Sequence, residues 1–305
     1  MNNRSWDVII IGGGPAGLSA ALTLGRCRRS VLLCDVGQPR NRASNAMHCF
    51  LSRDGADPKA FLQTAREQLA PYESVTLMQA LVLDVVKREK SFEVRLHHGE
   101  QHTCKKILLA TGVVDHLPAI AGVEQFYGVS VHHCPYCDGW EWRDQSIAAY
   151  GRGEKGGGLA LMLKQWTDDV ILLTDGPGEL SPDYRSRLEK EHIAIYEGQI
   201  GSMEGTPDGR LERIVMTSGD VLRRSAMFFN TGQHQRSSLP ARLGCELDNK
   251  GGVAVGEYEV ETCVDGIYVA GDASRDVQFV IVAAAEGTKA AFAINKALLK
   301  EVGRL

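Results

Sequence analysis

The chain has 305 residues, enough for two domains, and its 44% apolar and 24% charged residues exclude a disordered chain. Its net charge of −4 comes from 34 basic and 38 acidic residues spread along the sequence, so we expect no basic face for nucleic acid. No apolar run approaches the roughly 18 residues of a membrane span, and no basic-then-apolar leader precedes residue 6. We therefore expect a cytoplasmic protein that binds neither nucleic acid nor membrane.

The start of the chain reads as a strand, a glycine-rich turn, a helix and a second strand. Residues 6–11 form an apolar run too short for a helix, which is typical of a strand buried on both faces of a parallel sheet. A helix is predicted over 18–28, and 30–35 form a second buried strand that ends in Asp35. This order predicts a βαβ unit.

The turn carries Gly12-x-Gly14-x-x-Gly17, a spacing that suits a dinucleotide. Glycines allow a tight turn and close backbone approach, so that a pyrophosphate can sit at the N-terminus of the following helix. Asp35, 18 positions after Gly17, can hydrogen-bond a ribose hydroxyl. A glycine-rich turn alone occurs in any α/β protein, but the motif in this context predicts dinucleotide binding.

The pattern then recurs along the chain. Strands predicted at 92–96 and 107–112 complete the first unit, and strands at 146–150, 170–174 and 227–232 with a helix ending near 166 form the second. A buried strand at 266–272 and an alanine-rich helix from about 280 are too little for a domain, so this tail is expected to return to the first unit. We predict an α/β fold with two Rossmann-like, three-layer ββα nucleotide-binding domains, the second (117–235) inserted into the first (1–116 and 236–305).

The second unit has its own motif, Gly151-x-Gly153-x-x-Gly156, which suggests a nicotinamide nucleotide. An NADP site needs arginines after the next strand to hold the 2′-phosphate, but that position reads Thr174-Asp-Gly-Pro177. The charge disfavours NADP. NADH binding through Asp175 and a motif retained only for structure stay open.

Cys134-Pro-Tyr-Cys137 is the second chemical feature of the sequence. Two intervening residues let the thiols close into a disulfide, and one thiol of such a pair is typically acidic. Half of a zinc site is the alternative, but His132 and His133 lie too close to the pair for obvious tetrahedral geometry. A glutaredoxin-type site would lie near the start of a small domain, so a redox-active dithiol fits best, and no metal is expected.

Side chains around the pair have two interpretations each. Asp138 could shuttle the proton that a leaving thiolate needs, or cap a helix. Trp140 and Trp142 could line a groove near the dithiol, although core packing is the default. The remaining cysteines are expected to be buried and inert: Cys27, Cys34, Cys49, Cys104, Cys245 and Cys263.

The ordered set of the Gly12–Gly17 turn, Ala110-Thr-Gly112, Cys134-x-x-Cys137-Asp-Gly139 and Gly271-Asp272 resembles low-molecular-weight thioredoxin reductases over essentially the whole chain. The resemblance implies a split FAD domain, an inserted domain that carries the dithiol, and a homodimer. Cys137 would face the flavin, Cys134 would attack the external disulfide, and Asp138 would be the acid and base. The implied FAD-binding residues are Gly12, Gly13, Gly14, Pro15, Ala16, Gly17, Asp35, Ala110, Thr111, Gly112, Gly271, Asp272, Gln278 and Val280.

One departure from that family concerns the electron donor. Thr174-Asp-Gly176 replaces the usual basic cluster for NADPH, which resembles the deeply rooted and ferredoxin-dependent branches and the dithiol oxidases that use oxygen. Many of those oxidases carry His after the second cysteine, so Asp138 favours a reductase. We expect an FAD-dependent thiol-disulfide oxidoreductase that does not use NADPH and acts on a thioredoxin-like protein or a small disulfide, with a ferredoxin-like donor as one possibility. A dithiol oxidase and an NADH-dependent reductase are the alternatives.

Overall fold

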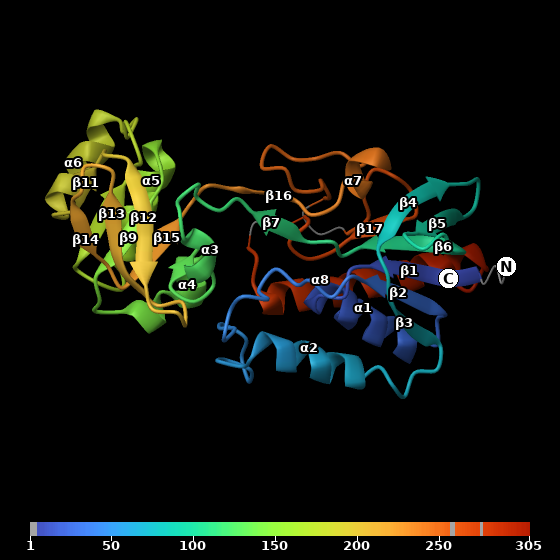
Figure 1. Cartoon of the computed structure of the whole chain (residues 1–305). Coiled ribbons are helices and arrows are strands. Elements are labelled where there is room, and N and C mark those ends of the chain that lie inside the picture. The colour runs from blue at the N-terminus through green and yellow to red at the C-terminus, as the bar shows by residue number, and fades with distance from the viewer. Residues whose placement is uncertain (1–4, 257–259, 275–276) are drawn as a thin grey trace.

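The computed structural model describes residues 5–256, 260–274 and 277–305. Two lobes are joined by two short antiparallel strands, β7 (Val113–Asp115) and β16 (Gln233–Gln235) (Figure 1). Each lobe has its own sheet. The predicted α/β class with two Rossmann-like units is confirmed.

The first lobe is built on a seven-stranded sheet in the order β3-β2-β1-β6-β5-β4, with β17 also paired to β6. The second half of β6 pairs in parallel with β17, so the tail of the chain completes the sheet formed by its beginning. The strands are β1 (Ser5–Ile11), β2 (Val31–Asp35), β3 (Val75–Gln79), β4 (Val82–Lys87), β5 (Phe92–Leu96), β6 (Gln101–Leu109) and β17 (Ile267–Val269).

Alternate residues of these strands enter two different cores. Val8 and Ile10 pack toward the helices, whereas Ile9 and Ile11 face the β4–β5 side. On the helical side α1 (Pro15–Arg26) and α8 (Val280–Glu301) pack tightly, because a Cβ on Gly287 would lie only 2.0 Å from the Ala16 carbonyl oxygen. The remaining helices of this lobe are α2 (Pro58–Glu67) and α7 (Leu239–Arg242).

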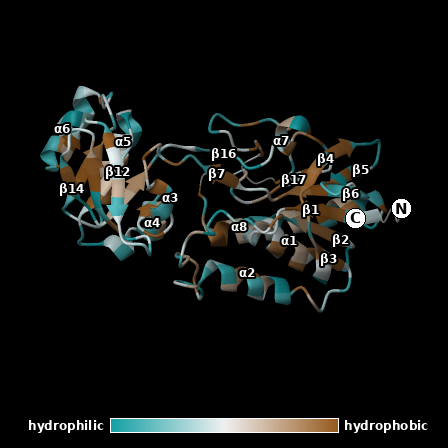
Figure 2. Ribbon diagram, in the orientation of Figure 1, coloured by the Kyte–Doolittle hydropathy of each residue, from teal (hydrophilic) through white to brown (hydrophobic). Residues whose placement is uncertain are grey.

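The second lobe contains a five-stranded parallel sheet in the order β11-β10-β9-β15-β8. One face is covered by an antiparallel sheet and the other by α5 and α6, so this lobe has three layers. Figure 2 shows hydrophobic residues along its strands and a mostly hydrophilic α6. The strands are β8 (Val131–His132), β9 (Ile147–Tyr150), β10 (Val170–Leu173), β11 (Ala194–Tyr196), β12 (Ile200–Gly205), β13 (Leu211–Met216), β14 (Val221–Arg223) and β15 (Ala226–Phe229). The helices are α3 (Val123–Phe126), α4 (Pro135–Asp138), the 3₁₀ helix η1 (Trp140–Trp142), α5 (Gly153–Leu163) and α6 (Pro182–Lys190).

Among the residues that the structure describes, no helix is long and apolar enough to cross a bilayer. The same part of the chain contains no group of three or more His, Cys, Asp or Glu side chains arranged to hold a metal ion.

Candidate active site

The first glycine turn needs its glycines for steric reasons. Gly12 has φ +112°, and a Cβ there would lie 2.2 Å from the Ala110 carbonyl oxygen. A Cβ on Gly17 would lie 1.9 Å from the Gly12 carbonyl oxygen, so Gly17 lets α1 pack against the turn. Gly14 differs, because a Cβ there meets nothing within 4 Å. Gly12 and Gly17 therefore shape the turn, and Gly14 leaves space in front of it.

The N-terminus of α1 is prepared for an anion. Its N-cap, Gly14, provides no capping side chain, Pro15 occupies the first turn, and that turn contains no acidic residue. The first N–H groups of a helix have no partner within the helix, so they are available to a phosphate. Asp35, at the end of β2, lies so close to Gly13 that a Cβ there would be 2.6 Å from the carboxylate. Its Oδ2 also accepts a hydrogen bond from Arg66 Nη2 at 3.1 Å.

A cavity of about 480 Å³ opens in front of this turn and extends to the second lobe. It is lined by these predicted residues: Gly12, Gly13, Gly14, Pro15, Ala16, Asp35, Ala110, Thr111, Gly112, Cys137, Asp138, Gly271, Asp272, Gln278 and Val280. Gly17 and Cys134 are not among the described residues that line this cavity. The Thr111 hydroxyl is buried without a hydrogen-bond partner in the described part of the chain. A buried hydroxyl normally has a hydrogen-bond partner, and a ligand bound in the cavity would provide one.

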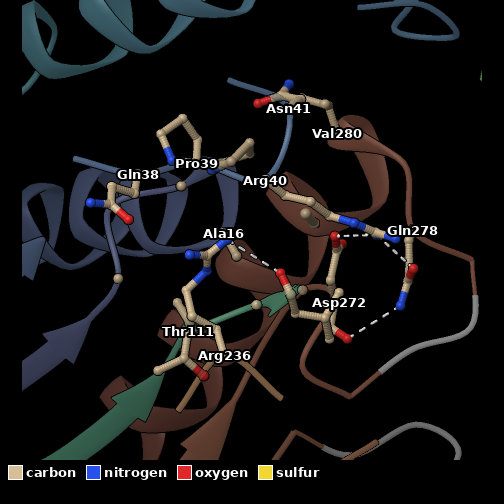
Figure 3. Close-up of a pocket in the computed structure, with 18 of the residues that line it drawn as sticks. Ala16, Gln38, Pro39, Arg40, Asn41, Thr111, Arg236, Asp272, Gln278 and Val280 are labelled. Carbon is tan, nitrogen blue, oxygen red and sulfur yellow. Dashed lines mark hydrogen bonds and ion pairs between the residues drawn. The ribbon is translucent and has the colours of Figure 1, made fainter. Parts of the chain in front are cut away.

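Arg40, which the sequence did not single out, crosses the cavity wall beside Asp272 (Figure 3). Its Nη1 lies 3.0 Å from Asp272 Oδ2 and 2.6 Å from Gln278 Oε1. Its Nε and Nη2 bind the two carboxylate oxygens of Asp115 on β7, and Nη2 also contacts Gln233 Oε1 on β16 at 3.0 Å. Burial raises the pKa of Asp272, although Arg40 opposes this effect. One guanidinium thus joins the cavity to both linker strands.

The two cysteines of the second motif form a disulfide with a Cα–Cα distance of 5.3 Å. Cys134 is the N-cap of α4, and its Sγ accepts a hydrogen bond from the Cys137 N–H at 3.2 Å. Cys137 lines the cavity, whereas Cys134 is not among its described lining residues. The pair therefore presents one sulfur toward the cavity.

Asp138, which ends α4, does not cap that helix, since Cys134 does so. Its Oδ1 lies 3.4 Å from Nδ1 of His132. His133 also faces the cavity, with Nδ1 3.9 Å from Asp115 Oδ2. Burial, together with the charge of Arg40, lowers the pKa of His133 to about 4. Acidic and imidazole groups thus surround the disulfide.

Two expectations for the neighbouring side chains are wrong. Trp140 is 64% exposed and packs against Arg143 rather than in a core, because η1 lies at the surface. Three of the six remaining cysteines are also exposed: Cys27, Cys49 and Cys263. Cys27 follows the end of α1, and Cys49 lies in the loop between β2 and α2, where its Sγ is 3.4 Å from the Tyr136 carbonyl oxygen. Apolar neighbours in sequence do not bury a side chain that lies in a surface loop.

Residues in and around the second glycine motif form hydrogen bonds within the protein. The N–H of Gly153 donates to the Gly178 carbonyl at 2.7 Å, and Glu154 stands in the first turn of α5. Arg152 turns back to donate to the Thr174 and Asp175 carbonyls. The Asp175 carboxylate accepts from the Ile200 N–H at 2.9 Å and from the Tyr150 hydroxyl at 3.3 Å. The Gly153 N–H, the Arg152 guanidinium and the Asp175 carboxylate thus already have partners within the protein.

A dinucleotide-type cavity with a disulfide at its far end defines a thiol-disulfide oxidoreductase. The model of the "Pyridine nucleotide-disulphide oxidoreductase" family matches residues 6–287, and the chain belongs to this family. It is 32% identical over 301 residues to a "Probable thioredoxin reductase" of Arthroderma benhamiae, covering 89% of this chain and 74% of that protein.

Solved structures agree with this assignment. A putative thioredoxin reductase TrxB from Bacillus anthracis is 32% identical with a TM-score of 0.92, covering 97% of this chain and 99% of that one. HlmI is 36% identical with a TM-score of 0.93, and the match covers 98% of this chain and 94% of that one. The chain is thus a thioredoxin reductase-like flavoprotein disulfide oxidoreductase with FAD as its cofactor. Three features fit that cofactor: the open turn at Gly14, the uncapped α1, and the Thr111 hydroxyl, which has no hydrogen-bond partner among the described residues.

Proposed function

We propose that this protein passes two electrons between FAD and the Cys134/Cys137 pair, and from there to an external disulfide, without using NADPH. The observation that carries the proposal is the asymmetry of the disulfide, in which Cys137 lines the cofactor cavity. This position supports Cys137 as the sulfur that faces the flavin and leaves Cys134 for the substrate.

FAD, when bound, supplies the two-electron redox chemistry. The backbone of the turn from Gly12 to Ala16 would hold its pyrophosphate, and Asp35 its ribose. Ala110, Thr111 and Gly112 would flank it, as would Gly271 and Asp272. Gln278 and Val280 would lie beneath the flavin at the start of α8.

The thiol chemistry then involves only this chain and its substrate. The Cys134 thiolate attacks one sulfur of the external disulfide, forms a mixed disulfide and releases the first substrate thiolate. Cys137 attacks Cys134 Sγ, re-forms the Cys134–Cys137 bond and releases the second. Asp138 takes the proton of Cys134 and returns it to a leaving thiolate. The substrate would be a thioredoxin-like protein or a small disulfide, and the enzyme a cytoplasmic homodimer.

The state of the second glycine motif supports a donor other than NADPH. Gly153 and Asp175 have partners within the chain, and Glu154 would repel a pyrophosphate at the start of α5. Electrons would then come from another carrier, such as a ferredoxin-like protein. The same observation favours a second candidate, a dithiol oxidase in which the substrate itself supplies electrons that pass on to oxygen.

Anaerobic titration of the FAD-loaded protein separates these functions. We expect that neither NADPH nor NADH bleaches the flavin, whereas dithionite does. Stoichiometric bleaching by either nucleotide would overturn the proposed donor and support a conventional reductase. Oxygen uptake with a small dithiol, at a rate above that of disulfide reduction, would support the oxidase.

A further inference from the structure

His132 is a buried imidazole held between two polar neighbours at the base of the dithiol. It ends β8, is 4% exposed and lines the cavity. Trp142 Nε1 donates to its Nε2 at 3.0 Å, and its Nδ1 lies 3.4 Å from Asp138 Oδ1. Both ring nitrogens therefore have a defined neighbour.

The tautomer of His132 follows from the chemistry of tryptophan. An indole N–H can only donate, so Nε2 of His132 must be unprotonated to accept from it. The neutral ring then carries its proton on Nδ1, which faces the Asp138 carboxylate. The bond from Trp142 therefore fixes which ring nitrogen presents its proton to Asp138.

The surroundings of His132 keep this arrangement in place. Residue 132 pairs with Phe228 in the parallel β8–β15 ladder, and its ring packs against the Phe228 ring at a centroid distance of 5.3 Å. Titratable groups near it include Asp138 on α4 and His133, which directly follows β8. From η1 and β15 it is contacted by Trp142 and Phe228, which do not titrate. Glu141 of η1 is directed to His48 at 3.5 Å instead.

We propose that Trp142 and His132 are positioning residues that orient the Asp138 carboxylate for proton exchange with the dithiol. The proposal rests on the function above, in which Asp138 takes the proton of Cys134 and delivers it to the leaving substrate thiolate. His132 Nδ1, 3.4 Å from Oδ1, would fix the orientation of the carboxylate relative to the dithiol. Its role should therefore matter most when the leaving thiolate is basic and needs a proton.

The test uses the FAD-loaded protein with its dithiol reduced, mixed rapidly with one of two disulfides. Hydroxyethyl disulfide releases a basic thiolate, and 5,5′-dithiobis(2-nitrobenzoate) releases one that needs no proton. With hydroxyethyl disulfide, Asp138→Asn should slow exchange by about 10²–10⁴-fold, and His132→Phe and Trp142→Phe by at least about tenfold. With the nitrobenzoate the losses should be clearly smaller, because only the deprotonation of Cys134 then still depends on Asp138. Trp140→Phe is the matched control and should match wild type, since Trp140 is exposed and contacts Arg143.

Two further measurements remove ambiguity if His132→Phe folds poorly. His132→Asn keeps an N–H near the Nδ1 position and should recover most of the rate. Nitrogen-15 NMR of the imidazole should show a protonated Nδ1 and an unprotonated Nε2 in wild type, and loss of that fixed tautomer in Trp142→Phe.

The outcomes distinguish the inference from the function on which it rests. Equal losses with both disulfides, or a Trp142→Phe rate equal to that of Trp140→Phe, would overturn the positioning role alone. An unaffected Asp138→Asn would overturn the acid-base role of Asp138 and that of His132 with it. If the reduced wild-type protein exchanges with neither disulfide, the proposed function itself fails.

Discussion

Arg40 donates hydrogen bonds to four side chains around the cavity and the linker: Asp115, Gln233, Asp272 and Gln278. Its guanidinium is 14% exposed and Asp115 is 5% exposed, so both charges have given up most of their water. Burying such a pair costs solvation free energy, which the attraction between the two charges offsets. Removing one partner leaves the other charge buried and uncompensated. Arg40 therefore has a structural role for both Asp115 and Asp272.

We predict that Arg40→Met lowers the free energy of unfolding by about 3–5 kcal/mol, because it leaves the buried Asp115 carboxylate and the partly buried Asp272 carboxylate without their cation. Urea unfolding of the two proteins measures this loss. Arg88→Met is the matched control, since the Arg88–Glu93 pair is half exposed, and its unfolding midpoint should stay unchanged. Equal effects of the two substitutions would contradict a structural role for Arg40.

At the level of elements, the glycines of the β1–α1 turn have two different roles. Gly17 is needed for packing within the protein, whereas Gly14 faces the space where the cofactor would lie. The sequence motif alone does not distinguish these roles. Replacing Gly17 and Gly14 by alanine, one at a time, does distinguish them.

We predict that Gly17→Ala destabilises the protein without FAD by about 1–3 kcal/mol, because the new methyl group overlaps the Gly12 carbonyl. Gly14→Ala should keep the same protein within about 0.5 kcal/mol of wild type, yet weaken FAD binding, because its methyl group enters the cavity. Thermal unfolding and flavin fluorescence titration measure the two effects. Normal FAD affinity in Gly14→Ala would refute this orientation of the turn.

The elements that the sequence predicts well are those whose pattern is local. The buried run of β1, the glycine turn and the acid at the end of β2 lie within one short segment, so periodicity and turn chemistry identify them. Arg40 and Trp142 lie in a loop and a short 3₁₀ helix without such a pattern. Their partners are distant in the chain or on another element, as with Arg40 and Asp272, so only the fold brings them together.

At the scale of the whole molecule, Asp115 on a linker strand and His133 beside it in the second lobe are groups whose charge depends on pH. Burial alone raises the pKa of Asp115, but hydrogen bonds and charge from Arg40 and the charge of His133 lower it to about 2. Burial lowers the pKa of His133 to about 4, so this ring is neutral near pH 7 and becomes charged only in acid. Both groups bind fewer protons folded than unfolded, so acid favours the unfolded chain.

We predict that stability is full above pH 6.5, the ordinary pKa of His, and falls as pH drops toward about 4 through His133. Below the ordinary value of 3.8 it falls further, toward about 2, through Asp115. Denaturant unfolding across this range measures the slope. His133→Asn should flatten its upper part, whereas the exposed His192→Asn should not. A pH-independent stability between 4 and 6.5 would contradict the lowered pKa of His133.

The most direct test of the assigned roles is the long-wavelength absorbance that a thiolate next to oxidised flavin produces. Cys134→Ser leaves Cys137 free at the cavity, so the FAD-loaded variant should show this band, and the band should disappear when the thiolate is protonated by acid. Cys137→Ser leaves Cys134, which is not among the described cavity-lining residues, and should show none. A band in Cys137→Ser and none in Cys134→Ser would reverse the roles of the two cysteines and contradict the account.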